Sequence, residues 1–297
     1  MRAGLLFVLA AQSALVPAQE RAPIFAGRAA ELVVLPVTVT DRRGAFMADL
    51  TRDRFTVFDN GRPQDLVLFS SEDTPVSVGL VIDASGSMRP KIPDVIAAAL
   101  AFARLSNTSD ELFTIPFNDV VLDQTSGRTP VSDLQSLALA LRSLVPQGRT
   151  ALYDALLAGL DRVTRGTHPR KALIVVSDGG DNASRATVES VMAQARRANV
   201  TIFTIGLFDD ADFERNPGVL KSLAESTGGE RFLPRSSKLL AVACERIARE
   251  LRAGYTLGYV PPDTDGAYHR IRVEVGQGQG PRLTVRTRPG YVAAGRP

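Results

Sequence analysis

A long alternation of strand and helix patterns, from about residue 76 to residue 254, is the feature that most constrains how this chain can fold. Short, almost entirely apolar runs such as "ALIVVS" and "VTIFTIGLF" are separated by stretches such as "SDLQSLALALRSL", in which apolar residues recur at three- and four-residue spacing. Near-continuous apolar strands are typical of a parallel sheet covered on both faces. The pattern predicts an α/β fold with a doubly wound, mostly parallel sheet over residues 76–254.

The individual elements follow from the same spacing. The expected strands are Val76–Ile82, Glu111–Phe117, Ala172–Ser177 and Val200–Leu207. The expected helices are Ile92–Leu105, Ser132–Leu144, Ala151–Thr164, Thr187–Ala198 and Lys238–Arg252.

Two flanking segments, residues 29–74 and 255–294, have a different texture. In "ELVVLPVTVTD" every second residue from Val33 to Val39 is apolar, and Asn60-Gly61 lies between two strand patterns. An Asn-Gly pair in that position is a strong hairpin signal. Three further strand patterns follow Gly254. We expect the two segments to pack together as one small β-rich module that flanks the α/β domain.

The first 18 residues are typical of a cleaved secretory signal. They combine a positive start, an apolar stretch from Ala3 to Ala11 and the small residues Val16-Pro17-Ala18. The sequence therefore predicts a secreted or periplasmic protein. The alternative is an uncleaved anchor, but the apolar stretch is shorter than the ~20 residues that span a bilayer. No later stretch is apolar for long enough to predict a transmembrane segment.

Composition excludes several classes of function. The chain has 35 Lys+Arg, 32 Asp+Glu and no Trp, and it has no basic stripe interleaved with aromatic residues, so a nucleic-acid partner is not expected. No phosphate-binding loop of the G-x-x-x-x-G-K-[ST] type indicates a nucleotide. Cys244 is the only cysteine, so an intramolecular disulfide is impossible, and its helical spacing predicts a buried core residue.

Polar oxygen-bearing residues follow the expected strands. The first strand ends in Asp83, Ser85 and Ser87, the strand "ALIVVS" is followed by Asp178, and the loop "PQGRTALYDAL" places Thr150 before a helix. In open parallel sheets, ligands bind outside the carboxyl ends of the strands. Two carboxylates and three hydroxyls, without histidine or thiol, suit a hard divalent cation such as Mg²⁺, with Mn²⁺ or Ca²⁺ as alternatives.

This donor set favours docking over catalysis. Neutral hydroxyls offset little of the charge of the ion, and if the carboxylates act through bound waters the metal retains affinity for an acidic oxygen supplied by a partner. Asp154 and Asp181 are nearby carboxylates that are expected either to orient the ligands or to be solvated. For Ser85 and Ser87 the alternative is an ordinary turn, and for Thr150 a helix cap.

These residues carry a family resemblance. Asp83-x-Ser85-x-Ser87, Thr150 in "GRTALYDAL" and Asp178 in "SDGGD" resemble the metal-ion-dependent adhesion site of the von Willebrand factor type A family. The resemblance covers residues 76–254 and implies a Rossmann-like fold, a divalent cation and an acidic ligand residue on a partner protein or extracellular ligand. The flanks, "VTVTDRRGAFMADLTRDRFTVFDNGRPQ" and "YTLGYVPP…RPGY", are also similar to those of secreted bacterial members.

Three other functions compete with metal-dependent binding. A hydrolase using Ser85 or Ser87 would need a base, and the two histidines, His168 and His269, have no evident route to these serines. A Mg²⁺-dependent phosphatase using Asp83 would be expected to carry a second carboxylate where Ser85 stands. A non-catalytic scaffold with an idle metal site is the third alternative. The sequence therefore predicts a binding protein and not an enzyme.

Overall fold

The computed structural model describes residues 32–122, 129–130, 133–208, 216–276 and 283–294. The predicted signal segment, residues 1–18, lies outside these ranges. Within the described ranges, no helix has the length and apolar character needed to cross a membrane.

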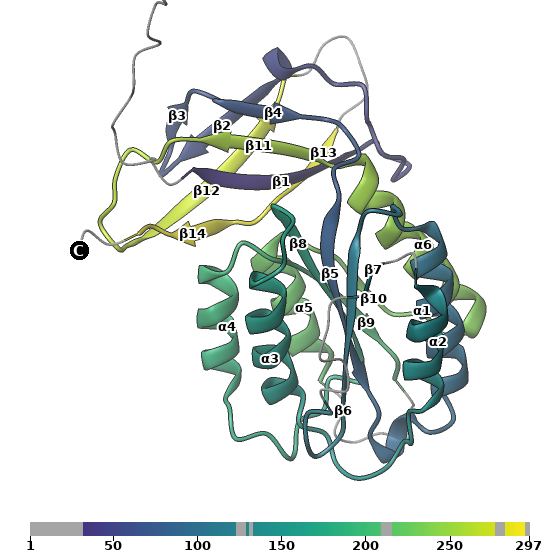
Figure 1. The fold of residues 1–297 in the computed structure, drawn as a ribbon. Coiled ribbons are helices and arrows are strands. Elements are labelled where there is room, and N and C mark those ends of the chain that lie inside the picture. The colour runs from purple at the N-terminus through teal and green to yellow at the C-terminus, as the bar shows by residue number, and fades with distance from the viewer. Residues whose placement is uncertain (1–31, 123–128, 131–132, 209–215, 277–282, 295–297) are drawn as a thin grey trace, which may run out of the picture. The chain divides into compact units, whose positions relative to one another are not determined.

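A six-stranded sheet in the order β10-β9-β8-β5-β6-β7 forms the centre of the α/β domain (Figure 1). Its strands are β5 (Val76–Asp83), β6 (Glu111–Phe117), β7 (Thr129–Pro130), β8 (Arg170–Ser177), β9 (Thr201–Gly206) and β10 (Arg231–Phe232). The first five strands of that order run parallel, and β7 pairs antiparallel with β6. All eight residues of β5 are buried, as the unbroken apolar run predicts for a strand covered on both faces.

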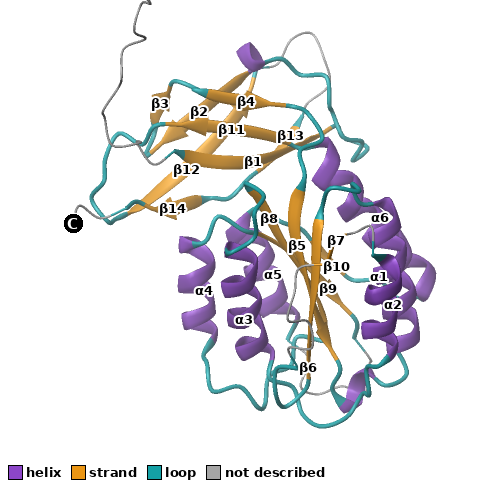
Figure 2. Ribbon diagram, in the orientation of Figure 1, coloured by secondary structure: helices purple, strands orange, loops and turns teal. Residues whose placement is uncertain are grey.

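Helices cover both faces of this sheet (Figure 2). They are α1 (Ile92–Leu105), α2 (Leu134–Arg142), α3 (Leu152–Thr164), α4 (Val188–Arg197), α5 (Pro217–Thr227) and α6 (Ser237–Ala253). One apolar core joins one face of the sheet to α1, α2 and α6, and a second core joins the other face to α3, α4 and α5. The predicted fold class, a doubly wound, mostly parallel sheet, is confirmed.

Helix α5 is an element that the periodicity did not predict. Asn216 caps its first turn by accepting a hydrogen bond from the Val219 amide, Pro217 is its first residue, and Gly228 ends it with a left-handed backbone (φ 81°). A proline at the start and a glycine at the end are ordinary helix boundaries. The boundary residues therefore signalled a helix whose apolar repeat, Leu220, Leu223 and Ala224, is short.

The flanking segments form two four-stranded antiparallel sheets around a shared apolar core. One sheet has the order β13-β1-β11-β4 and the other β14-β12-β2-β3. The strands are β1 (Val33–Thr40), β2 (Phe55–Asp59), β3 (Arg62–Gln64), β4 (Leu68–Ser70), β11 (Tyr255–Tyr259), β12 (Tyr268–Val275), β13 (Thr284–Arg286) and β14 (Gly290–Val292). β1 pairs with β11 and β2 with β12, so each sheet combines strands from before and after the α/β domain.

Local sequence explains two details of this β-rich module. The residues predicted to alternate in β1, such as Leu35 and Val37, are buried against the module core. Asn60 (φ 47°) and Gly61 (φ 81°) connect β2 to β3, and two successive positive φ angles are typical of the type I′ hairpin turn that Asn-Gly favours.

A buried carboxylate, Asp59, lies within the module. It accepts hydrogen bonds from the hydroxyls of Tyr259 (2.7 Å) and Tyr291 (3.0 Å), and its other oxygen lies 2.7 Å from Nδ1 of His269. The second ring nitrogen of His269 lies 3.2 Å from Asp265. His269 is therefore held between two carboxylates inside the module.

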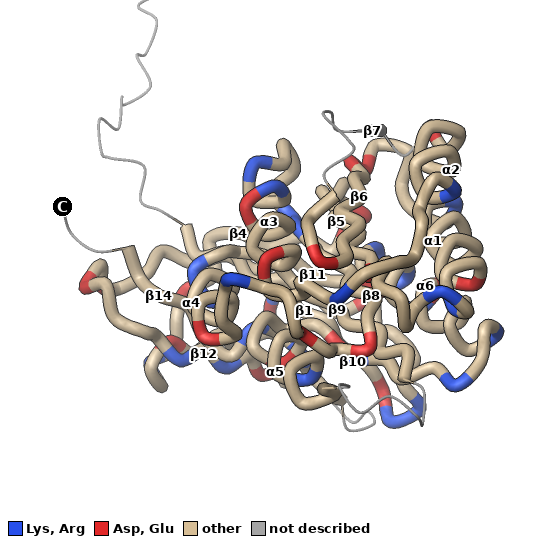
Figure 3. Tube along the Cα trace, turned by 90° about the horizontal axis from the view of Figure 1, so that it is seen from below, with Lys and Arg blue, Asp and Glu red and all other residues tan. Residues whose placement is uncertain are grey.

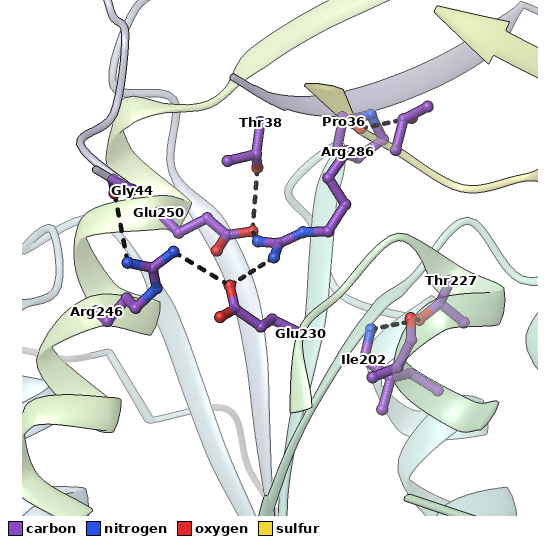
Figure 4. Close-up of polar contacts among 11 residues, drawn as sticks. Pro36, Thr38, Gly44, Ile202, Thr227, Glu230, Arg246, Glu250 and Arg286 are labelled. Atoms are coloured by element: carbon purple, nitrogen blue, oxygen red, sulfur yellow. Dashed lines mark hydrogen bonds and ion pairs between the residues drawn. The ribbon is translucent and has the colours of Figure 1, made fainter. Parts of the chain in front are cut away.

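A charged network joins helix α6 to the module (Figure 4). Glu250 of α6, 3% exposed, accepts a hydrogen bond from the Thr38 hydroxyl of β1 (3.0 Å) and pairs with Arg286 of β13. Arg286 also pairs with Glu230 (2.5 Å), which lies 3.5 Å from Arg246 of α6. Burial lowers the pKa of Arg286, but the charges of Glu250 and Glu230 outweigh this effect and raise it. The network therefore holds Arg286 charged at the contact between α6 and the module.

Candidate metal site

The register of the central sheet brings the ends of its strands to one level. Asp83, the last residue of β5, lies opposite Phe117 of β6, and Ile82 lies opposite Val176 of β8. Ser177 of β8 in turn lies opposite Gly206 of β9. Strand order reverses at β5, which has β6 on one side and β8 on the other, and such switch points form ligand crevices. The loops after β5 and β8 therefore meet at the position where a ligand is expected.

Asp83 is completely buried at this point. Its Oδ1 accepts a hydrogen bond from the Ser85 amide (2.9 Å) and its Oδ2 from the Ser177 hydroxyl (2.7 Å). Burial raises the pKa of Asp83 to about 6; hydrogen bonds from Ser85 and Ser177 moderate the rise, and the charge of Asp178 adds to it. Desolvation penalises the ionised carboxylate, so a bound cation would stabilise it.

Ser85, Ser87 and Asp178 form a chain of oxygen atoms beside Asp83. The hydroxyls of Ser85 and Ser87 share a hydrogen bond of 3.1 Å, and Ser87 donates to Oδ2 of Asp178 (2.9 Å). Gly86–Met88 form a short 3-10 helix, and the Ser85 side chain makes no capping bond to it. The Ser87 hydroxyl therefore contacts Asp178, the residue that follows β8, and Ser85 lies beside it. An ordinary turn would not require this contact.

Thr150 lies in a loop that is hydrogen-bonded to the residues following β5. The Gly86 amide donates to the Gly148 carbonyl (3.1 Å), and the Gln147 amide donates to the Ala84 carbonyl (3.0 Å). The N-cap position of α3 is Ala151, which makes no side-chain capping bond, so Thr150 does not cap this helix, in contrast to the alternative considered from the sequence. Thr150 is buried, and its loop runs alongside Ser85-Gly86.

The donor set fits a hard cation. An octahedral Mg²⁺ ion with ligands at about 2.0–2.1 Å has neighbouring ligand atoms about 2.9 Å apart. The two oxygen–oxygen distances through Ser87 are 3.1 and 2.9 Å, so a shared ion could replace these hydrogen bonds with little movement. Ser87 is exposed, which opens the cluster to solvent. The described residues contain no group of three or more His, Cys, Asp and Glu side chains in a metal-binding arrangement, so any such site depends on the hydroxyls.

Comparison with known sequences identifies the domain that carries this cluster. The sequence profile of the von Willebrand factor type A domain matches residues 77–241, more than half of the 297-residue chain. The chain belongs to the von Willebrand factor type A domain family. The matched range includes every strand end and loop of the type A domain described above.

Solved structures show the same fold at low sequence identity. The von Willebrand factor type A protein of Catenulispora acidiphila matches with a TM-score of 0.52 and 15% identity, over 81% of this chain and 70% of that one. The vWF domain of the type V pili tip protein Mfa5 of Porphyromonas gingivalis matches with a TM-score of 0.50 and 16% identity, over 60% and 95%. The PilB minor pilin of Streptococcus sanguinis matches with a TM-score of 0.50 and 12% identity, over 61% and 62%.

A sequence relative matches part of this chain. An uncharacterized protein of Synechocystis, sll0103, is 26% identical over 192 residues. The alignment covers 61% of this chain and 43% of that protein, so the chain matches less than half of the relative's length.

Three neutral residues that the sequence analysis did not select position the type A domain loops. Ser177 donates to Asp83, the Asn182 side chain accepts from the Thr150 amide (2.9 Å), and the Asn118 carbonyl accepts from the Ala151 amide (2.7 Å). Ser177 ends β8, Asn118 follows β6, and Asn182 lies in the loop after β8. Their position near strand ends is the sequence signal that could have identified them.

Asp154 and Asp181 order a neighbouring loop. Asp154 accepts hydrogen bonds from the amides of Arg185 (3.0 Å) and Ala186 (2.9 Å). Asp181 accepts from the Ser184 hydroxyl (2.6 Å) and the Tyr153 amide (3.3 Å). The contacts described for both carboxylates thus fix the loop after Asp178 against the start of α3, and they reach the cluster only through the backbone.

Proposed function

We propose that this protein binds a partner protein through a divalent cation, Mg²⁺ or alternatively Mn²⁺ or Ca²⁺, at the end of β5. Asp83, Ser85, Ser87, Thr150 and Asp178 would hold the ion, and an Asp or Glu of the partner would complete its coordination. The predicted signal segment would place this activity outside the cytoplasm, in the periplasm or in secreted form.

The contact between Ser87 and Asp178 carries the proposal. It joins the loops after β5 and β8 directly beside the buried Asp83, and it leaves Ser87 exposed. A bound cation would supply positive charge to carboxylates that desolvation disfavours. Membership of the type A family and structural neighbours that include a pilus tip protein and a minor pilin are consistent with an adhesion role.

The positions of the histidines favour binding over hydrolysis. The backbone of His168 lies at Ser77, the second residue of β5, six residues and so about 20 Å along the strand from Asp83. His269 lies in the β-rich module between Asp59 and Asp265. A serine nucleophile at position 85 or 87 would therefore have neither histidine within reach as a base.

Calorimetric titration of residues 19–297 with Mg²⁺ and Mn²⁺, beside the Asp83→Ala/Ser85→Ala variant, tests the proposal. Saturable binding by the wild-type protein and loss of binding in the variant are expected. Far-ultraviolet circular dichroism of both proteins controls for folding. A variant that is folded and binds the metals as the wild type does would overturn the assignment of the site.

A further inference from the structure

Two exposed arginines lie on the rim of the candidate metal site. Arg89 follows Ser87 by two residues, and its guanidinium donates to the Pro146 carbonyl (3.2 Å). Arg149 precedes Thr150, and its guanidinium donates to the Asn182 carbonyl (3.3 Å). Each guanidinium is thereby tied to a loop next to the site: Arg89 to the loop that contains Gly148, and Arg149 to the loop after β8.

The arginines keep most of their donors for other contacts. A guanidinium has five N–H groups, and the contact described for each arginine uses one of them. Both side chains end at backbone carbonyls, so their positive charges are not neutralised by these contacts. Arginine forms bidentate pairs with carboxylates, which makes it suited to read a second acidic residue near the first.

Acidic residues near the same rim differ in how far they face outward. Asp154 and Asp181 are partly buried, and their oxygens accept the backbone and hydroxyl donors described above. Asp119 is exposed, and its carboxylate lies so close to Gly148 that a Cβ atom at position 148 would clash with it. Figure 3 shows basic and acidic positions on this end of the domain. Asp119 would repel an acidic partner that the two arginines attract.

Exposed apolar side chains complete the rim. Val120, 56% exposed, follows Asp119, and Val145, 63% exposed, precedes the Pro146 carbonyl that anchors Arg89. Arginine is enriched at protein interfaces, and exposed apolar side chains are stabilised by burial there. The surface around the site therefore has the chemistry to contact a protein segment on both sides of a metal-bound carboxylate.

We infer that the partner segment carries at least one further carboxylate beside the one that reaches the cation, and that Arg89 and Arg149 bind it. This inference rests on the proposed function, because the cation sets where the first carboxylate lies. The partner is thus an acidic protein segment, with Asp or Glu residues close together in its sequence.

Two synthetic peptides test the inference: one with a single Asp in a Gly/Ser background, and one of equal length with three Asp residues. Binding is measured by fluorescence anisotropy in 5 mM Mg²⁺ and 150 mM salt. The wild-type protein is expected to bind the three-Asp peptide about fivefold to tenfold more tightly than the single-Asp peptide. The Arg89→Gln/Arg149→Gln variant should reduce this ratio to about threefold or less, the statistical advantage of three Asp residues over one, while it still binds Mg²⁺ without peptide.

A matched control separates a local effect from net charge. Arg104 and Arg165 are exposed at the far ends of α1 and α3, the helices that begin beside the site, so Arg104→Gln/Arg165→Gln removes the same charge elsewhere and should keep the wild-type ratio. Asp119→Asn should strengthen binding of the three-Asp peptide. If wild-type protein binds Mg²⁺ but shows equal or undetectable affinity for both peptides, the inference is overturned. Absence of Mg²⁺ binding would instead contradict the proposed function itself.

Discussion

Asp83 and Glu250 are both almost completely buried, at 0% and 3% exposure, but their surroundings differ. Glu250 pairs with Arg286 from a different part of the chain and accepts a hydroxyl hydrogen bond from Thr38. Asp83 accepts its hydrogen bonds from the Ser85 amide and the Ser177 hydroxyl, both neutral groups, and its charged neighbour is the carboxylate of Asp178. Glu250 thus has a permanent cation, Arg286, within the fold. Asp83 has only neutral donors and a second carboxylate among the contacts described for it.

The difference separates a structural use of buried charge from a binding use. A buried ion pair keeps its two partners together because removing either leaves an uncompensated charge. A carboxylate supported by neutral donors beside another carboxylate is costly when ionised and gains from an ion bound from solution. Removing the cation beside Glu250 should therefore destabilise the fold, whereas removing the charge of Asp83 should stabilise it when no metal is bound.

Replacement of Arg286 by Met should produce the largest effect. It would leave Glu250 buried without its cation and would also remove a partner of Glu230. We expect a loss of about 3–5 kcal/mol in the free energy of unfolding, measured by urea denaturation. The Glu250→Gln/Arg286→Met variant should recover much of this loss. A single variant as stable as the wild type would show that the network contributes little to the contact of α6 with the module.

Asp83→Asn should change stability in the opposite direction. The pKa of Asp83 is raised to about 6, so the stability present at low pH is lost as pH rises from about 4 through about 6. With a chelator at pH 8, the variant should be more stable than the wild type by about 3 kcal/mol. The two proteins should converge at pH 4. Lower stability of the variant at pH 8 would contradict the comparison.

Ser177→Ala tests how far neutral donors support Asp83. The Ser177 hydroxyl donates to Oδ2 of Asp83 and accepts from the Gly179 amide (3.0 Å). Its removal should cost about 1.5–3 kcal/mol at pH 8, the usual range for a hydrogen bond to a charged group. Thermal or chemical denaturation measures this loss. The same substitution in an Asp83→Asn background should cost less. Equal costs in both backgrounds would mean that Ser177 does not act through the Asp83 charge.

His269 provides a third, titratable case, with the smallest expected effect. Burial lowers its pKa, but hydrogen bonds to Asp59 and Asp265 outweigh this effect and raise it. The stability gained from its charged form is fully present below the unfolded pKa of about 6.5 and is lost as pH rises through the folded pKa. Between pH 6 and pH 9, the wild-type free energy of unfolding should therefore fall relative to that of His269→Gln. Parallel pH profiles would show that His269 keeps one charge state throughout.

The clustering of the polar residues that follow the strands was predictable from sequence, because parallel strands have their carboxyl ends at one edge of a sheet. That rule alone placed Asp83, Ser85 and Asp178 close together before any side-chain contact was known. Ser177 and Asn182 were not selected because a neutral polar residue in a loop has no distinctive pattern, and its role depends on which loops cross. Helix α5 was missed because only a short apolar repeat, Leu220, Leu223 and Ala224, lies between its boundary signals, Asn216-Pro217 and Gly228.

Charge networks were the part of the fold least accessible to sequence. His269 was considered only as a possible base, and its position between Asp59 and Asp265 depends on antiparallel pairing between β12 and β2, which are far apart in the chain. Glu250 lies on the helix α6, and its partners Thr38 and Arg286 come from β1 and β13, which are distant in sequence. Local spacing describes an element, but the partner of a buried charge follows from tertiary contacts.

The pairing of early strands with late strands in the β-rich module constrains the order in which the chain can fold. Val33 of β1 lies opposite Tyr259 of β11, whereas the strands of the type A domain pair with neighbours closer in sequence. Long-range pairings form slowly because the intervening chain must first be ordered. A growing chain would expose the apolar side of β1 until residues beyond 255 emerge, and an unpaired strand of this kind is prone to aggregation. Assembly of the type A domain brings the two ends together, so closure of the module would mark the end of folding.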